Sequence, residues 1–173
     1  MKKMQQLRAH LISSISQLQT NPDQLEMKVT AGTPACGMGT NLNIEYRYTT
    51  QLTIYDFSHD IDIVMIPLLI WLSEHQSELL VDPNKAKTSI NIEMDVIDNS
   101  KADVRITFPL TERHIVKSVD GKLQVDIPEE PQYDAFWAQQ SLTLEDHDGT
   151  PLVTFTTSDE QGSALFMPFP TKR

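Results

Sequence analysis

The sequence predicts an α+β fold, in which a mostly antiparallel β-sheet carries two main helices on one face and a β-hairpin arm extends from it. Apolar and polar residues alternate over Leu42–Ile54, which is typical of a half-buried strand. Apolar residues recur at helical spacing over Met4–Leu18, which indicates an amphipathic helix. They occupy nearly the whole circumference of a second helical run, Ile61–Leu72, and such a helix needs cover on more than one side.

The first part of the chain is expected to supply one helix and two strands. The N-terminal helix ends at Asn21-Pro22-Asp23 and should lie over the sheet, because proline stops the helical pattern. Residues 25–29 alternate as a first strand. The segment Gly32 to Thr40 is rich in glycine and proline, so it is predicted to be a mobile loop before the long strand.

The middle of the chain is expected to supply the central helix and a hairpin. Asp60 is a suitable N-cap for the helix, because its side chain can accept a hydrogen bond from a free N–H of the first turn. Asp82-Pro83-Asn84 breaks the chain after the helix. The strands Ile90–Val96 and Val104–Leu110 then pair across Asp98-Asn99-Ser100. Their apolar residues share the even register, which predicts one continuous apolar face that is buried from solvent.

The last third of the chain is expected to extend away from this sheet. The chain continues to a tight turn at Asp120-Gly121 and returns, which predicts the arm. Pro128-Glu129-Glu130-Pro131 is a linker by composition, and alternation around Asp148-Gly149 predicts a second, peripheral hairpin. The predicted organisation is an α+β domain at 1–127, a linker and hairpin extension at 128–158, and a flexible tail at 159–173.

Composition limits the classes of function. The 173 residues suit one domain with a sizeable core. The net charge of −10 argues against a protein that binds nucleic acid tightly, since phosphate binding depends on clustered Lys and Arg. A single cysteine, Cys36, excludes an internal disulfide. No export signal is visible at the start, and Ile61–Leu72 is shorter than the about 20 apolar residues that span a bilayer, so no membrane association is expected.

No motif in the sequence indicates catalysis, a cofactor or a metal. The five histidines are scattered singly, without the spacing of a metal site. A small hydrolase would have to use Cys36 with His59, Asp60 and Asp62, which are the nearest approach to a reactive cluster. Gly37-Met38-Gly39 lacks the lysine and the following helix of a phosphate loop. We therefore expect a protein that is not an enzyme.

Three residues have both a structural and a binding interpretation. Trp71 suits the core of the fold, and it also suits an anchor at a subunit boundary, where tryptophan is enriched. Glu112 and Arg113 lie on opposite faces of an extended chain, where they are either a solvated strand end or contacts with two different neighbours. The apolar central helix favours self-association, with the N-terminal helix as the alternative cover.

Several segments between residue 1 and about residue 127 stand in an order and spacing typical of one family. They are Asn21-Pro22-Asp23, Asn41–Tyr48, Tyr55-Asp56-Phe57, Pro67–Leu72 with Glu74-His75-Gln76, and Leu110-Thr111-Glu112-Arg113. Together these segments resemble the tail completion protein R family of temperate phages with contractile tails. This resemblance implies a non-enzymatic virion protein that, like tail terminators, closes the head-proximal end of the tail tube.

The resemblance also implies partners and contact residues. It implies a sixfold ring that binds the tube protein, with the sheath and neck proteins as further neighbours, and assembly in the host cytoplasm. DNA would only pass through, because six copies at −10 carry a formal −60 and repel it. A head-side neck adaptor or head completion protein is the structural alternative, and a small virion hydrolase is the enzymatic one. The implied contact residues are Arg47, Trp71, Glu112 and Arg113.

Overall fold

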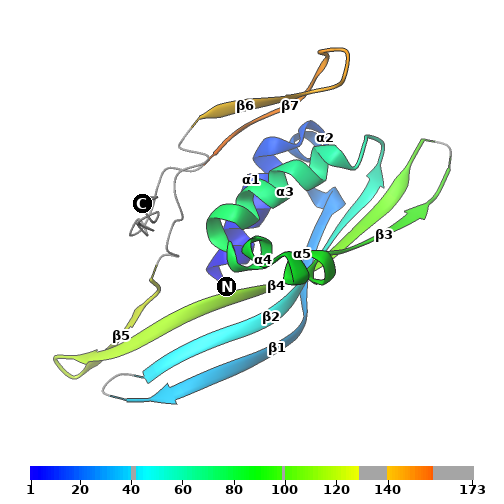
Figure 1. Cartoon of the computed structure of the whole chain (residues 1–173). Helices are drawn as coiled ribbons and strands as arrows, with labels where there is room; N and C mark the ends of the chain where they lie inside the picture. The colour runs from blue at the N-terminus through cyan, green and yellow to red at the C-terminus, as the bar shows by residue number, and fades with distance from the viewer. Residues whose placement is uncertain (40–41, 99, 129–139, 158–173) are drawn as a thin grey trace, which may run out of the picture.

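The computed structural model describes residues 1–39, 42–98, 100–128 and 140–157. Within these ranges a long, curled antiparallel sheet carries helices on one face, which confirms the predicted α+β class (Figure 1). The elements are α1 (Lys2–Ser14), α2 (Ser16–Thr20), the 3₁₀ helix η1 (Pro22–Gln24), β1 (Leu25–Met38), β2 (Leu42–Phe57), α3 (Asp62–His75), α4 (Glu78–Val81), α5 (Pro83–Ser89), β3 (Asn91–Val96), β4 (Ala102–Val119), β5 (Lys122–Asp126), β6 (Ser141–Glu145) and β7 (Pro151–Thr156).

The sheet is built around two long central strands. The strand order is β1-β2-β4-β3, and β5 pairs with the far end of β4. β2 and β4 are antiparallel from Leu42 opposite Val116 to Phe57 opposite Ala102. The even residues of β4 from 104 to 110 are fully buried beneath the helices. The alternation in the sequence therefore identified the buried face correctly for β4 and for β2 from Tyr48 to Ile54, whereas Leu42 at the start of β2 is 44% exposed.

The helix layer consists mainly of α1 and α3, as predicted. Leu7, Leu11 and Leu18 are fully buried, but α1 ends before Ile15, whose backbone is extended. α3 begins at Asp62, so Asp60 lies one residue before the cap position, yet its Oδ1 still accepts a hydrogen bond from the Asp62 N–H at 3.2 Å. Among the described residues no helix is long and apolar enough to cross a membrane.

The apolar helix α3 is covered by its own chain. None of its residues from Ile63 to Leu72 is exposed. The sheet and α1 enclose it, and Val153 and Phe155 of β7 belong to the same core cluster. The interpretation that a second copy covers this helix is therefore wrong, and the alternative cover, the N-terminal helix, is what the structure has. Any self-association has to use other surfaces.

The predicted loop from Gly32 to Thr40 is wrong, because β1 continues to Met38 and pairs with β2 throughout. β2 offers a long row of backbone hydrogen-bonding groups, and pairing with it overrides the local preference of glycine and proline for turns. Pro34 is tolerated because β1 is an edge strand. A Cβ atom at Gly32 would lie 3.3 Å from the Tyr48 Cβ, so a small residue suits this position. Thr40 itself lies outside the described residues.

The segment between α3 and β3 is more ordered than the sequence predicted. Asp82-Pro83-Asn84 does break the chain, but it also starts α5, which the sequence analysis missed together with α4. The Asp82 carboxylate accepts a hydrogen bond from the Asn84 N–H at 2.9 Å, and Pro83 occupies the first helical position, where proline is favoured.

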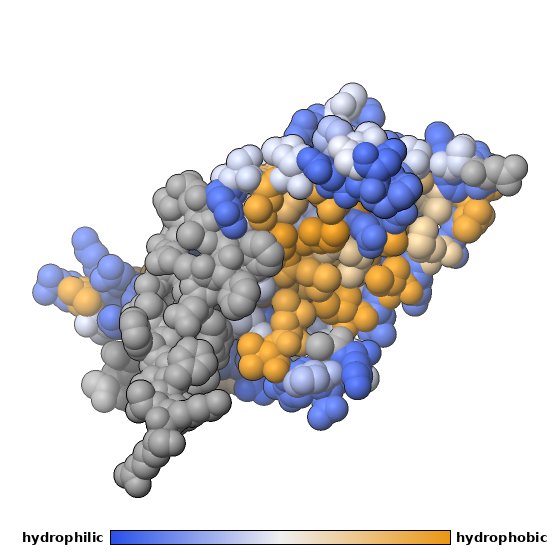
Figure 2. Space-filling view, turned by 45° about the horizontal axis from the view of Figure 1, so that its top comes forward, coloured by the Kyte–Doolittle hydropathy of each residue, from blue (hydrophilic) through white to orange (hydrophobic). Residues whose placement is uncertain are grey.

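The hairpin of β3 and β4 is confirmed, but the predicted burial of its continuous apolar face is not. Ile92 lies opposite the buried Ile106, so it points to the helix-bearing side of the sheet. The helices do not cover β3, and Ile92, Met94 and Val96 are 46%, 46% and 75% exposed. Figure 2 shows apolar surface gathered on this side of the molecule.

The arm and the second hairpin both form as predicted. β5 pairs with residues 115–119 of β4 across Asp120 and Gly121, which have positive φ angles of 51° and 72°. β6 pairs with β7 to form a separate two-stranded sheet. Residues 129–131 of the predicted linker and the predicted tail at 159–173 lie outside the described residues. The division of the chain into a domain, an extension and a tail stays a prediction.

Candidate functional site

Glu112 lies at the centre of a buried polar network at the N-terminus of α1. Its carboxylate accepts hydrogen bonds from the backbone N–H groups of Lys2 at 3.1 Å and Lys3 at 3.0 Å. It also accepts one from the Tyr48 hydroxyl at 2.5 Å, and the two residues are 2% and 3% exposed. A carboxylate here satisfies N–H groups that have no intrahelical partner and complements the helix dipole. Glu112 therefore links the N-terminus of α1 to the sheet.

The same contacts keep Glu112 charged. Burial by itself raises the pKa of Glu112, but the hydrogen bonds from Tyr48, Lys2 and Lys3, with the N-terminal ammonium group, outweigh burial and lower the pKa. Burial and the bond to the carboxylate raise the pKa of Tyr48, which therefore stays a neutral donor. The His114 Nε2 lies 3.5 Å from the second carboxylate oxygen.

Lys3 connects this network to the end of α3. Its Nζ donates hydrogen bonds to the backbone oxygen of His75 at 2.6 Å and to Oε1 of Gln76 at 3.0 Å. The His75 ring stacks on Trp71 with 4.3 Å between ring centroids, and Trp71 is only 3% exposed. Trp71 and Glu112 are thus enclosed by groups of their own chain.

The Gln76 side chain also lies at the edge of β4, in the stretch between the two short strands β3 and β5 that pair with β4. β3 pairs with residues 102–107 and β5 with residues 115–119, which leaves the stretch between them without a strand. The Thr111 N–H points to this edge and donates to Gln76 Oε1 at 3.0 Å. Pro109, two residues earlier, has its nitrogen on the same edge but carries no N–H to satisfy.

Arg47 and Arg113 meet at Glu45 on the face of the sheet opposite the helices. Glu45 Oε1 accepts a hydrogen bond from Arg47 Nε at 2.6 Å, and Arg113 Nη2 lies 3.7 Å from Glu45 Oε2. The bond from Arg47 lowers the pKa of Glu45. The two arginine side chains are 66% and 65% exposed, so donors of both guanidinium groups face solvent. These three residues, the outer triad, form an exposed charged contact point.

A shallow groove of about 470 Å³ opens beside the outer triad, across β1, β2 and β4. Cys36 is exposed within the groove. Glu45 supplies the one carboxylate of its lining, and none of the lining residues is a histidine. The lining residues are Ala35, Cys36, Gly37, Asn43, Ile44, Glu45, Arg113 and Ile115.

The four residues considered for a hydrolase are not brought together. Cys36 pairs with Ile44 near one end of β2, whereas His59 follows the other end at Phe57 and packs edge-on against that ring. At about 3.3 Å per residue, the strand between these ends is roughly 40 Å long. Within the described part of the chain, no group of three or more His, Cys, Asp or Glu residues is placed to hold a metal ion.

The sequence analysis named both arginines, Arg47 through the family resemblance alone, but it did not predict that they share Glu45 as a partner. Glu45 and Arg47 are two apart on a strand, so their common face was visible in the sequence. The approach of Arg113 depends on the pairing of β2 with β4, which puts Glu45 opposite Arg113. The roles of Lys3 and Gln76 join distant segments and had no local signal.

A pair of tyrosine substitutions tests how much the buried network contributes to stability. Tyr48→Phe removes a hydrogen bond to a buried carboxylate and is expected to lower the free energy of unfolding by about 2 kcal/mol. Tyr55→Phe is the matched control, since the Tyr55 hydroxyl donates to Glu26 at the same 2.5 Å but at the surface. It should change stability little. Urea unfolding of both variants measures the difference, and equal losses would contradict the assignment.

Comparison with known proteins identifies a family whose match includes both sites described above, the Glu112 network and the outer triad. Residues 1–131 match the family described as P2 phage tail completion protein R (GpR). A relative, tail completion protein R of Escherichia phage P2, is 35% identical over 131 residues, which cover 76% of this chain and 84% of the relative. No solved structure matches the chain. The matched region contains the Glu112 network and the outer triad, and it ends before β6 and β7.

Proposed function

Because the chain belongs to the P2 phage tail completion protein R (GpR) family, we propose that it caps the head-proximal end of a phage tail tube. The family match, which extends from α1 through β5, is the observation that carries this proposal. In this role the protein is a structural component of the virion, assembles in the host cytoplasm and performs no catalysis.

A cap of this kind works by shape. A polymerising tube exposes the same surface after each added ring, so growth stops when a bound protein offers no equivalent surface to the next subunit. The cap also presents a new upper face to which a filled head can join. A fold stabilised by a continuous core and by the Glu112 network suits this role, since the surface that blocks growth must hold its shape.

The cap is proposed to be a ring of six copies around the DNA passage. Six copies carry a formal charge of −60, so the ring would let DNA pass without holding it. Arg47 and Arg113 of the outer triad are the proposed contacts with a neighbouring tail protein, because their exposed guanidinium groups can pair with carboxylates there. The tube protein is the first expected partner, and the sheath and neck proteins are further neighbours.

Deleting the gene from its phage tests the proposal. Heads should form normally, while tails should be unjoined or over-long, and wild-type protein supplied from a plasmid should restore joined tails of normal length. The variant with Cys36→Ser, His59→Gln, Asp60→Asn and Asp62→Asn should restore them equally well, because no reaction is required. Normal joined tails without the gene would overturn the proposal. Binding of the purified protein to portal rings instead of tube ends would favour the neck adaptor.

A further inference from the structure

One end of the sheet presents an apolar surface that the described residues leave exposed. Ile92, Met94 and Val96 of β3 point to the helix-bearing side and are between 46% and 75% exposed. Ile97, the next residue, is 56% exposed. We call the three β3 residues the β3 patch. Exposed apolar side chains gathered on one face are a feature of protein–protein contact sites.

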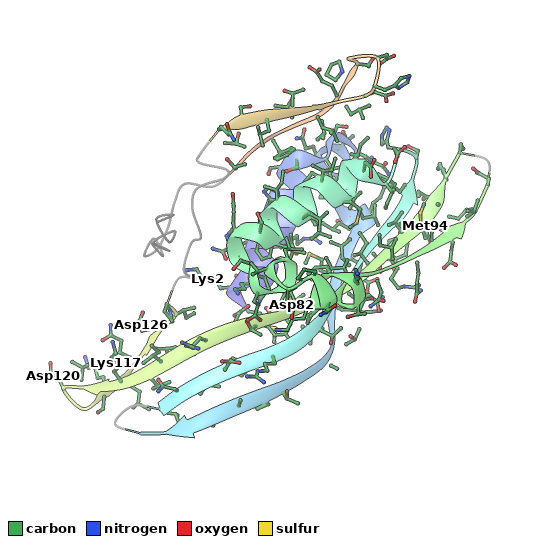
Figure 3. The ribbon with its side chains drawn as sticks, in the orientation of Figure 1. Lys2, Asp82, Met94, Lys117, Asp120 and Asp126 are labelled. Atoms are coloured by element: carbon green, nitrogen blue, oxygen red, sulfur yellow. The ribbon has the colours of Figure 1, made fainter. Side chains whose placement is uncertain are left out.

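The opposite end of the sheet has a second open apolar surface. Leu42, Leu123 and Val125 are 44%, 78% and 55% exposed. Leu42 and Val125 both lie opposite Val116, and Leu123 is two residues from Val125, so all three share one face. We call these residues the arm patch. Figure 3 shows the separation of the two ends, with Met94 at one and Lys117, Asp120 and Asp126 at the other.

The two patches lie on the same side of the sheet. The β3 residues are opposite even positions of β4, and Leu42 is also opposite an even position of β4. Two unlike patches at opposite ends of a subunit suit a head-to-tail contact, in which one copy offers the first patch and the next copy the second. Such contacts close into rings when the rotation between copies is right.

Charge supports the same pairing. Residues 91–105 around the β3 patch contain four acids and two bases, whereas residues 115–126 of the arm contain two acids and two bases. The arm is therefore neutral in a chain whose net charge is −10. Contact between two β3 hairpins would join like charges, whereas contact between an arm and a β3 hairpin does not.

We propose that the arm patch of one copy docks on the β3 patch of the next copy, and that this contact joins the subunits of the ring. The number of copies in the ring rests on the proposed function. The contact between two copies does not, and it can be tested with the purified chain.

The test uses the full chain with a charge placed in one patch at a time. Val96→Asp blocks the β3 patch, Leu123→Asp blocks the arm patch, and Ser141→Asp on the exposed edge of β6 is the control. Native mass spectrometry should show rings for wild type and the control, at high concentration or with tube protein present. Each patch variant alone should associate at least roughly tenfold more weakly. Unfolding curves confirm that both variants are folded.

Mixing the two patch variants distinguishes a head-to-tail contact from a symmetric one. Each variant keeps one intact patch, so an equimolar mixture should form a heterodimer with a single junction and no ring. Rings that persist in either variant, or a mixture that stays monomeric, would overturn the proposed contact. A wild-type chain that is monomeric in all conditions would also overturn it. The proposed function would fail separately, if deletion of the gene left tails normal while the purified protein still formed rings.

Discussion

Replacing Glu112 by alanine is expected to lower the free energy of unfolding by about 3 kcal/mol at neutral pH. The substitution leaves the Tyr48 hydroxyl and the N–H groups of Lys2 and Lys3 without their acceptor in a buried site. Unsatisfied buried donors cost more than the loss of a surface bond. Glu45→Ala is the control, because the carboxylate of Glu45 is held by exposed arginines and its loss should change stability little.

The pH dependence of stability provides the second measurement on Glu112. Its pKa in the folded protein is lowered from the ordinary value of 4.5, so its stabilisation is complete above that value and is lost as the pH falls through the lowered pKa. Glu112→Gln has no titrating group at this position. The difference in stability between wild type and Glu112→Gln should therefore shrink below pH 4.5. A difference that stays constant or grows on acidification would contradict the charged network.

Replacing Phe155 by alanine is expected to lower the free energy of unfolding by about 3 kcal/mol. Phe155 is 5% exposed on β7, and its ring meets His10 of α1 edge-on at 6.3 Å between centroids. Its removal leaves a cavity between the hairpin and the helix layer. Thr154→Ala is the matched control, because Thr154 is exposed and pairs with Thr143 on the outer face of the hairpin.

The Phe155 result bears on the extension beyond the family match. The match ends at residue 131, yet β7 contributes Val153 and Phe155 to the main core cluster. A single cooperative transition shifted by Phe155→Ala would show that the hairpin unfolds with the rest of the chain. An unchanged transition would show that the hairpin is dispensable for stability, as its predicted peripheral position implies.

The sequence predicted the central strands and main helices because their periodicity is set by burial in the finished fold. It failed at residues 32–38, where pairing with β2 prevails over the turn preference of glycine and proline. It also failed at β3, because alternation shows which residues share a face but not whether anything covers that face. Local pattern therefore gave the direction of side chains, and tertiary packing decided their burial.

The difference between the direction of a side chain and its burial also explains where the proposed contact residues lie. Glu112 was expected to be either a solvated strand end or a contact with a neighbour, and it is instead buried among groups of its own chain. It continues the even register of the buried β4 residues, a signal of burial that the sequence analysis did not use. Arg113 occupies the odd register and lies on the open face, as its neighbours in the pattern imply. The burial of Trp71 confirms the core interpretation of that residue. The acceptor that unites Arg47 and Arg113 required knowledge of strand pairing.

β4 pairs with β3 at one end and with β5 at the other, so one continuous strand connects the two proposed docking surfaces. Its 18 residues span roughly 60 Å at about 3.3 Å each. In the proposed ring, the length and curl of this strand set the circumference. Deleting two residues from the middle of β4 and the residues paired with them on β2 and β1 would keep every side chain on its face and shorten each subunit by about 7 Å. Deleting one would turn the far docking surface to the opposite side of the sheet.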